Sequence, residues 1–535
     1  MSTVQHSGRV LRQNFLRRCL CVLQLRQPLV STLLFGLLIA ALLWAAPAIA
    51  AGPAGRFISI QGPVEVVRGS QTLTATDQLQ LQAGDVIRTG ANARVAILLL
   101  DGTKLKLGPN ATVHLKHLSS ERLGQVTPVA AGGVQTVMRF FLGQGWLQKS
   151  GPADALEIET PTVRAATKGT EFALEVGPDG GTVLSVLNGH VQVANPKGEV
   201  LVAPGEQAWV RGRPEWMNLA YGALPKQTPY LGGEESPAKR VLSNPIEVIQ
   251  WSFYYRGGVS PKDYRALPAA ELAELEAILV PYRAGLLAEA RERLDAARVS
   301  RPNSPALLDV NALLFLARGQ VPEAKAALEA ALTHDSADAA AHAILAEVAL
   351  VQNRIADGEA EADLALAANR ESPSAWLAVS RARQAQSKLE PALQASAQAR
   401  ALDPQYVRAL VQEATLFFWM GRTEEAWALT QQAQALAPKD ATVLSLLGFL
   451  ELARGQKQAA LASFRKATET DSTLGEPHLG AGIVLLRLGQ VVEAVEELET
   501  ANLLESQDAL LRGYFGEGLY CGGVFGRICR RGSRL

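Results

Sequence analysis

Cysteine is nearly absent from this chain. Its 535 residues include only Cys19, Cys21, Cys521 and Cys529, so the long body between them is free of cysteine. A disulfide framework and cysteine-bound metal are therefore excluded from that body. The formal net charge is zero. The sequence thus lacks the basic excess that nucleic-acid binding usually needs, and we expect no nucleic-acid partner.

Histidine is also scarce, and sequence motifs of known chemistry are missing. The chain has seven histidines, and no H-E-x-x-H, G-x-S-x-G or Walker loop occurs in it. A catalytic site needs convergent acid, base or nucleophile candidates, and the sequence offers none. We therefore predict a protein that is not an enzyme, with no catalytic residue, no metal site and no cofactor.

Acidic residues are absent before Glu65, whereas five arginines occur within residues 1–27. An apolar run at residues 28–46 comes next, followed by Ala48-Ile49-Ala50, which fits an A-x-A cleavage site. This order is typical of a secretory signal peptide, which we assign to residues 1–50. The alternative is an uncleaved anchor, because the run is long enough to span a bilayer. Either way the remaining chain leaves the cytoplasm. We predict a periplasmic or secreted protein, the alternative being an inner-membrane anchor that faces the periplasm.

Residues 57–213 alternate apolar and polar side chains with a period of two, as at Val64 and Val66. That period is typical of strands with one buried face. Turn-forming pairs such as Asp101-Gly102 separate the runs, and both residues of such a pair tolerate positive φ. The region is therefore predicted to be an all-β domain.

Several motifs in this region occur together in a known family. They include GPVEVVRG from Gly62, GDVIRTG from Gly84 and TPTVRAATKGTEFALEV from Thr160. The region resembles the FecR domain family of periplasmic sensors and regulators. Where members of this family usually have Val-Arg-Gly-Thr, this chain has Ala-Thr-Lys-Gly-Thr at residues 166–170. The family also implies a cytoplasmic anti-sigma segment, where this chain has only the Arg-rich residues 1–27. We therefore expect an extracytoplasmic binding or assembly module.

Small or turn-forming residues recur at a fixed interval of 34 through the second half of the chain. They are Gly285, Gly319, Asn353, Ser387, Gly421, Gly455, Gly489 and Gly523. We call these eight positions the ladder. Alanine follows most of them after five and again after twelve residues, as at Ala290 and Ala297. The pattern predicts stacked helix pairs, each joined by a tight turn.

Residues 271–520 resemble tetratricopeptide repeats, because many positions agree in phase. The third unit departs from the family at Asn353 and Gly358, where Gly and Ala are usual. The resemblance implies an all-α solenoid. The predicted fold class is thus multidomain: an all-β FecR-like domain plus an all-α tetratricopeptide solenoid.

The end of the chain loses the repeat pattern. Residues 521–535 have no acidic residue and include two of the four cysteines, whereas a terminal repeat should present a polar outer face. We interpret this segment as an aberrant tail, arising from a frameshift or a truncated gene model after about Tyr520. The alternative is a natural disordered tail.

Residues 214–270 form the predicted linker between the two domains. Within it, Ile246 to Gly258 is strongly aromatic. We expect Trp251, Phe253 and Tyr255 to dock the linker on the first repeat or on the β domain. The alternative is an exposed patch for a partner.

The groove of the helix stack is the best candidate for a functional surface. Stacked helix pairs curve, and the first helix of each pair lines the concave side. The residues that the register projects there are Glu347, Arg381, Arg408, Thr415, Trp419, Ser445, Phe449 and Glu476. This mix of charged and aromatic side chains suits a peptide or another extended polymer.

We interpret the chain as an extracytoplasmic scaffold of the bacterial envelope that binds an unidentified protein or peptide. Two alternatives remain open at this stage. One is an envelope signalling or sensor protein related to FecR-type regulators, and the other is a glycan-binding or cell-wall-associated protein. We expect the chain to be anchored in the membrane only if the signal segment is not cleaved.

Overall fold

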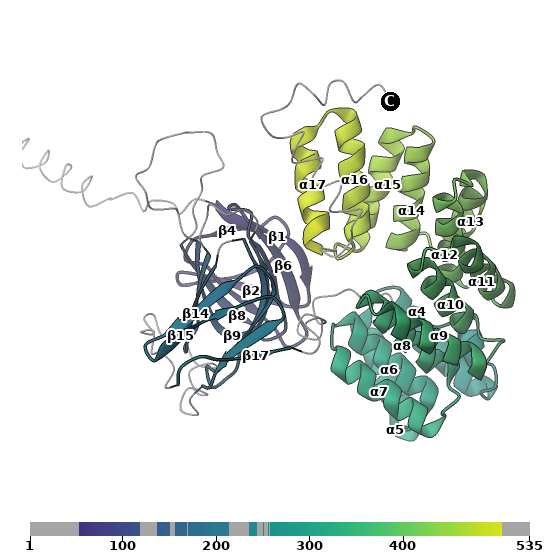
Figure 1. Cartoon of the computed structure of the whole chain (residues 1–535). Coiled ribbons are helices and arrows are strands. Elements are labelled where there is room, and N and C mark those ends of the chain that lie inside the picture. The colour runs from purple at the N-terminus through teal and green to yellow at the C-terminus, as the bar shows by residue number, and fades with distance from the viewer. Residues whose placement is uncertain are drawn as a thin grey trace, which may run out of the picture. The chain divides into compact units, whose positions relative to one another are not determined.

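The computed structural model describes residues 53–117, 136–149, 156–167, 169–212, 235–242, 250, 255 and 257–504. The predicted signal or anchor segment and the predicted aberrant tail lie outside these ranges. No helix within them is long and apolar enough to span a bilayer. Within these ranges the strands come first in the sequence and the α-helices follow (Figure 1). The predicted fold class, an all-β part followed by a tetratricopeptide-like solenoid, is confirmed.

The β part contains seventeen strands among the described residues. They are β1 (Pro53–Gln61), β2 (Val64–Arg68), β3 (Gln71–Thr74), β4 (Gln80–Gln82), β5 (Val86–Thr89), β6 (Arg94–Leu99), β7 (Lys104–Leu107), β8 (Thr112–His117), β9 (Thr136–Gln148), β10 (Leu156–Glu159), β11 (Arg164–Thr167), β12 (Glu171–Val176), β13 (Thr182–Asn188), β14 (Val191–Asn195), β15 (Gly198–Val202), β16 (Glu206–Val210) and β17 (Ala238–Val241). Nearly all of their pairings are antiparallel, and β10 runs parallel to β9.

Strand β9 joins two sheets. Its first half pairs with β8 and β10, with Phe140 opposite Val113. Its second half pairs with β7 and β12, with Leu147 opposite Phe172. The change of sheet occurs at Gly143, whose φ is +89° and where a Cβ would lie 2.5 Å from Cα of Ala111. Only glycine fits this close approach without strain.

The inward side chains of both sheets form one apolar core, which includes the fully buried Phe140 and Phe172. The Asp101-Gly102 turn contributes a buried ion pair to the same part. Lys149 Nζ lies 2.8 Å from Asp101 Oδ2, and both side chains are almost fully buried. Asp101 also accepts hydrogen bonds from the backbone and hydroxyl of Thr103. The turn therefore anchors the end of β9 as well as reversing the chain.

The helical part contains fourteen α-helices among the described residues, preceded by the short 3-10 helix η4 (Pro261–Tyr264). They are α4 (Ala269–Arg283), α5 (Leu287–Ser300), α6 (Pro305–Ala317), α7 (Val321–His334), α8 (Ala339–Val351), α9 (Ile355–Ala368), α10 (Pro373–Ala385), α11 (Leu389–Leu402), α12 (Val407–Trp419), α13 (Thr423–Leu436), α14 (Ala441–Ala453), α15 (Lys457–Thr470), α16 (Gly475–Leu488) and α17 (Val491–Leu504). They form seven consecutive pairs.

The ladder positions end the first helix of each pair. All seven that the structure describes have positive φ, from +58° at Asn353 to +79° at Gly489. A left-handed residue after a helix ends it and lets the next helix fold back. Glycine adopts this conformation without the Cβ penalty, which explains its recurrence. The alanines that follow are buried at the helix contacts, as at Ala290 and Ala297.

The first helices of successive pairs contact one another, for example α6 with α8, α8 with α10 and α10 with α12. This row forms the inner face of a stack of helix pairs. Positions 34 residues apart therefore lie next to each other on one surface of the helix stack.

Candidate functional site

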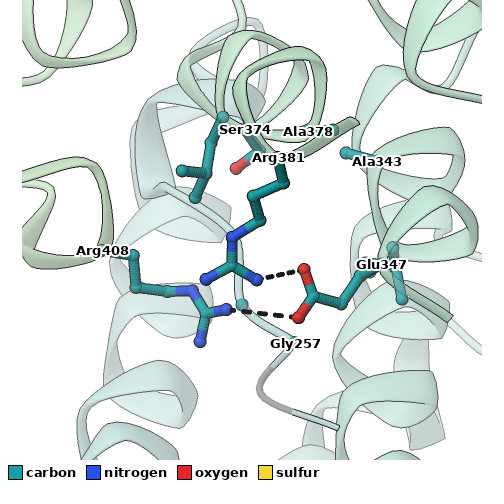
Figure 2. Close-up of a pocket in the computed structure, with 10 residues that line it drawn as sticks. Gly257, Ala343, Glu347, Ser374, Ala378, Arg381 and Arg408 are labelled. Carbon is teal, nitrogen blue, oxygen red and sulfur yellow. Dashed lines mark hydrogen bonds and ion pairs between the residues drawn. The ribbon is translucent and has the colours of Figure 1, made fainter. Parts of the chain in front are cut away.

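Three predicted partner-binding residues meet in a small polar pocket on the inner face (Figure 2). Glu347 lies on α8, Arg381 on α10 and Arg408 on α12. Arg381 Nη1 pairs with Glu347 Oε2, and Arg408 Nη2 lies 3.9 Å from Glu347 Oε1. Two guanidinium groups thus share one carboxylate.

The charges in this pocket are not balanced. Among its lining residues, Glu347 is the one acid beside two arginines. Burial lowers the pKa of Arg381, and the nearby charge of Arg408 lowers it further, although Glu347 opposes both effects. Arg408 Nε is buried with no hydrogen-bond partner among the described residues. The pocket therefore carries an excess positive charge and one unsatisfied donor.

A segment of the chain itself closes the pocket. Residues 257–264, which we call the strap, precede the first helix pair and run across the inner face. Tyr282 Oη donates to the carbonyl of Gly257 at 2.8 Å, and Tyr406 Oη donates to the carbonyl of Gly258 at 3.0 Å. Burial raises the pKa of Tyr282 to about 12, so its hydroxyl remains a donor. With the strap in place, the cavity is about 20 Å³, room for a single water molecule.

The two glycines allow this close approach. A Cβ on Gly257 would lie 2.8 Å from Cδ2 of Leu313, and a Cβ on Gly258 would lie 2.9 Å from Cδ of Arg408. Any side chain at either position would need its neighbour to move. The Gly-Gly pair is therefore required by contact with the helices rather than by a turn.

The middle of the strap is held by hydroxyl and carboxyl groups. The backbone amide of Ser260 donates to Ser374 Oγ at 3.0 Å, and its hydroxyl donates to Asp403 Oδ2 at 2.6 Å. Asp263 accepts from the hydroxyls of Ser372 and Ser374 at 2.7 and 2.5 Å. Burial raises the pKa of Asp263 to about 6 despite these donors.

The end of the strap is anchored in the first repeats. Tyr264 Oη donates to Asp309 Oδ2 at 2.8 Å, and both residues are buried. Burial and the nearby Asp338 raise the pKa of Asp309 well above its ordinary value. Together with its carbonyl contacts, the strap forms hydrogen bonds to α4, α6, α10 and the turn before α12.

The other predicted groove residues do not line this pocket. Trp419 ends α12 with 58% of its surface exposed. Phe449 packs edge-on against Phe464, with ring centroids 4.9 Å apart. Ser445 is buried, and its hydroxyl has no hydrogen-bond partner among the described residues. Thr415 and Glu476 are half-buried on α12 and α16.

Sequence reasoning located the aromatic linker but missed how far it reaches. Tyr255 is buried, and its hydroxyl accepts from Gln352 Nε2 at 3.1 Å, so the chain docks beyond the first repeat. Trp251 and Phe253 lie outside the described residues. The signals for the strap were the Gly-Gly pair and the tyrosines of α4 and of the turn before α12. Glycine and tyrosine also occur in the cores of ordinary solenoids, so these residues alone did not predict the strap.

Within the described ranges, no group of three or more His, Cys, Asp or Glu side chains could hold a metal ion. What the pocket and strap region offer is a row of hydroxyl donors and guanidinium groups. That arrangement recognises backbone carbonyls and carboxylates.

The geometry defines the class of each part. The helix pairs, with their 34-residue period and left-handed closing residues, fit tetratricopeptide repeats. For the β part, residues 85–192 match a family model described as FecR protein. A search of curated proteins found no match.

Among solved structures, the APC/C hetero-tetramer Cut9-Hcn1 aligns at 15% identity and a TM-score of 0.42, covering 50% of this chain and 53% of that one. The chain thus spans about half of that neighbour. A thermophilic TPR protein from Thermus thermophilus aligns at 19% identity and 0.31, covering 34% and 97%. A tetratricopeptide repeat protein from Parabacteroides merdae aligns at 17% identity and 0.33, covering 46% and 98%.

A FecR module joined to tetratricopeptide-like repeats supports a role in protein interaction or signalling. Both kinds of module are typically regulatory or binding modules rather than enzymes. The function therefore has to be argued from the surfaces that the chain offers.

Proposed function

We propose that this chain is a scaffold protein of the bacterial envelope that binds protein partners through the inner face of its helix stack. It acts in the periplasm or after secretion, delivered by the signal segment at residues 1–50. The observation that supports the proposal most is the strap. The inner face already binds an extended polypeptide segment, because the hydroxyls of Tyr282 and Tyr406 donate hydrogen bonds to the backbone carbonyls of Gly257 and Gly258.

Recognition of this kind suits a protein partner better than a glycan or a nucleic acid. Tyrosine hydroxyls that donate to main-chain carbonyls select for polypeptide, whatever its side chains. The exposed Trp419 adds an aromatic anchor of the type that dominates protein interfaces. We expect the half-buried Thr415 on α12 and Glu476 on α16 to extend the same surface beyond the strap, whereas Ser445 is buried and Phe449 packs against Phe464.

A photo-crosslinking experiment tests this function. The full chain carries benzoylphenylalanine at Trp419 in one variant and at Val299 in a control, because Val299 is 86% exposed on the second helix of its pair. We expect one discrete crosslinked protein from the Trp419 variant, recovered from the envelope fraction and absent from the Val299 control. The same products from both positions would reject the proposal, and so would binding to purified peptidoglycan alone.

A signalling role is the second candidate, and the FecR match at residues 85–192 favours it. In that case the β part senses a ligand and the helix stack relays to a partner. Deleting the gene should then change transcription of a set of envelope genes, and a sigma factor should be encoded nearby. Unchanged transcription would reject the signalling role and leave the scaffold role as the remaining candidate.

A further inference from the structure

The strap forms hydrogen bonds with several polar groups of the inner face but leaves the charge of the pocket unbalanced. Near the pocket it contributes Gly257 and Gly258, which have no side chain to offer. Arg381 and Arg408 are left to share Glu347, and Arg408 Nε stays without a hydrogen-bond partner among the described residues. Burying an under-compensated guanidinium group costs free energy. A ligand that supplied a second carboxylate here would recover part of that cost.

The structure also shows where such a carboxylate would come from. A Cβ built on Gly258 lies 2.9 Å from Cδ, 3.2 Å from Nε and 3.5 Å from Cζ of Arg408, so the flexible Arg408 side chain has to shift to admit a side chain there. A side chain attached at that point of an extended ligand would therefore end beside the guanidinium group. Five residues later, Asp263 marks a second acid position, where the carboxylate accepts from Ser372 and Ser374. The two positions are fixed by one continuous backbone, so their spacing is a property of the site.

We propose that the partner of the inner face is an extended acidic peptide that has one carboxylate at the place of Gly258 and another five residues later, and that it binds by displacing the strap. This inference rests on the proposed function and specifies its ligand. The strap is then a tethered, weaker version of the partner. It lacks the first of the two acids, and this is the feature that lets an external segment compete with it.

The experiment uses the purified full chain and two fluorescent peptides. Both carry the sequence of residues 255–264, with Gly258→Glu in one and Gly258→Gln in the other, so that they differ in charge and not in size. The chain is used unchanged and as a Ser260→Ala variant, which loses the hydrogen bond to Asp403 and thus holds its strap less firmly. Fluorescence anisotropy gives the affinity of each peptide for each chain.

We expect the glutamate peptide to bind the Ser260→Ala chain at least tenfold more tightly than the glutamine peptide, and to bind the unchanged chain more weakly. Arg408→Gln should abolish the difference between the peptides, whereas Arg408→Lys should retain part of it. Circular dichroism confirms that each variant is folded. Equal affinities for the two peptides, or no binding to the Ser260→Ala chain, would overturn the proposal. A third peptide with the unaltered sequence of residues 255–264 serves as a control. Binding of this control as tight as that of the glutamate peptide would also overturn the proposal, since it would point to exchange of straps between two copies of the chain.

A second measurement does not depend on added peptide. Gly258→Glu and the isosteric Gly258→Gln both force Arg408 to shift, but only Gly258→Glu supplies a carboxylate to it. Hydrogen exchange in the strap should therefore be slower in the Gly258→Glu chain than in the Gly258→Gln chain. Equal exchange in the two variants would contradict the charge argument. If peptide binding fails while crosslinking from Trp419 succeeds, the acidic partner is rejected and the scaffold function stands. If crosslinking also fails, the proposed function falls with it.

Discussion

Two substitutions at ladder positions should change stability in opposite directions. Ser387 has a φ of +61°, and Gly421 has a φ of +76° at the equivalent position of the next pair. A residue with a Cβ in this left-handed region is disfavoured by about 1–2 kcal/mol. Ser387→Gly should therefore stabilise the helix stack, and Gly421→Ala should destabilise it.

The magnitude follows from the surroundings of each residue. Ser387 is exposed, so its replacement removes no buried surface. The greater freedom of glycine in the unfolded chain offsets about 0.4–1 kcal/mol of the gain, which leaves a net stabilisation of about 0.5–1 kcal/mol. A Cβ on Gly421 would meet no atom within 4 Å. Its cost of about 1 kcal/mol thus arises from the backbone alone.

Urea unfolding followed by circular dichroism at 222 nm measures both effects. The unfolding midpoint should rise for Ser387→Gly and fall for Gly421→Ala, with the same slope against urea as the unchanged chain. A fall in the midpoint for both variants would refute the reasoning, because it would show that Ser387 is selected for a contact rather than tolerated in a strained turn.

Three further predictions concern buried charges. Burial raises the pKa of Asp263 from 3.8 to about 6, so the free energy of unfolding should decrease as the pH rises from about 4 to 6. In the Asp263→Asn variant, the urea midpoint should change less with pH over that range. The neighbouring Glu361 raises the pKa of His342, so His342→Gln should reduce stability by less than about 1 kcal/mol below pH 6.5 and have little effect at pH 9. Lys149→Met should destabilise the β part by about 3–5 kcal/mol, because it strands the buried carboxylate of Asp101. Thermal unfolding should show partial recovery when Asp101→Asn is added, and a larger loss in the double variant would contradict the ion-pair account.

The repeat architecture could be predicted because it depends on local rules. The ladder marked the turns, and Asn353 and Ser387 fitted it because they too adopt the left-handed conformation there. Glu347, Arg381 and Arg408 could be placed on one surface because the period carries successive helices into contact. These inferences use spacing along the chain and need no knowledge of distant contacts.

Other features depended on contacts between distant segments, and local rules do not carry that information. Gly143 reads as an ordinary strand glycine, yet it marks the change from one sheet to the other because Ala111 lies against it. The path of the strap depends on hydroxyl groups of Ser374 and Tyr406, more than a hundred residues away. The sequence indicated that the linker docks, but the pairing of these partners required the folded chain.

Hydrogen–deuterium exchange of the strap in the full chain tests the central claim most directly. The amides of Ser260, Lys262 and Asp263 are all hydrogen-bonded, the first of them to Ser374 on α10. We predict that peptides covering residues 257–264 exchange as slowly as those from α10. Exchange as fast as that of an open linker would contradict the occupied inner face and, with it, the proposed competition with a partner.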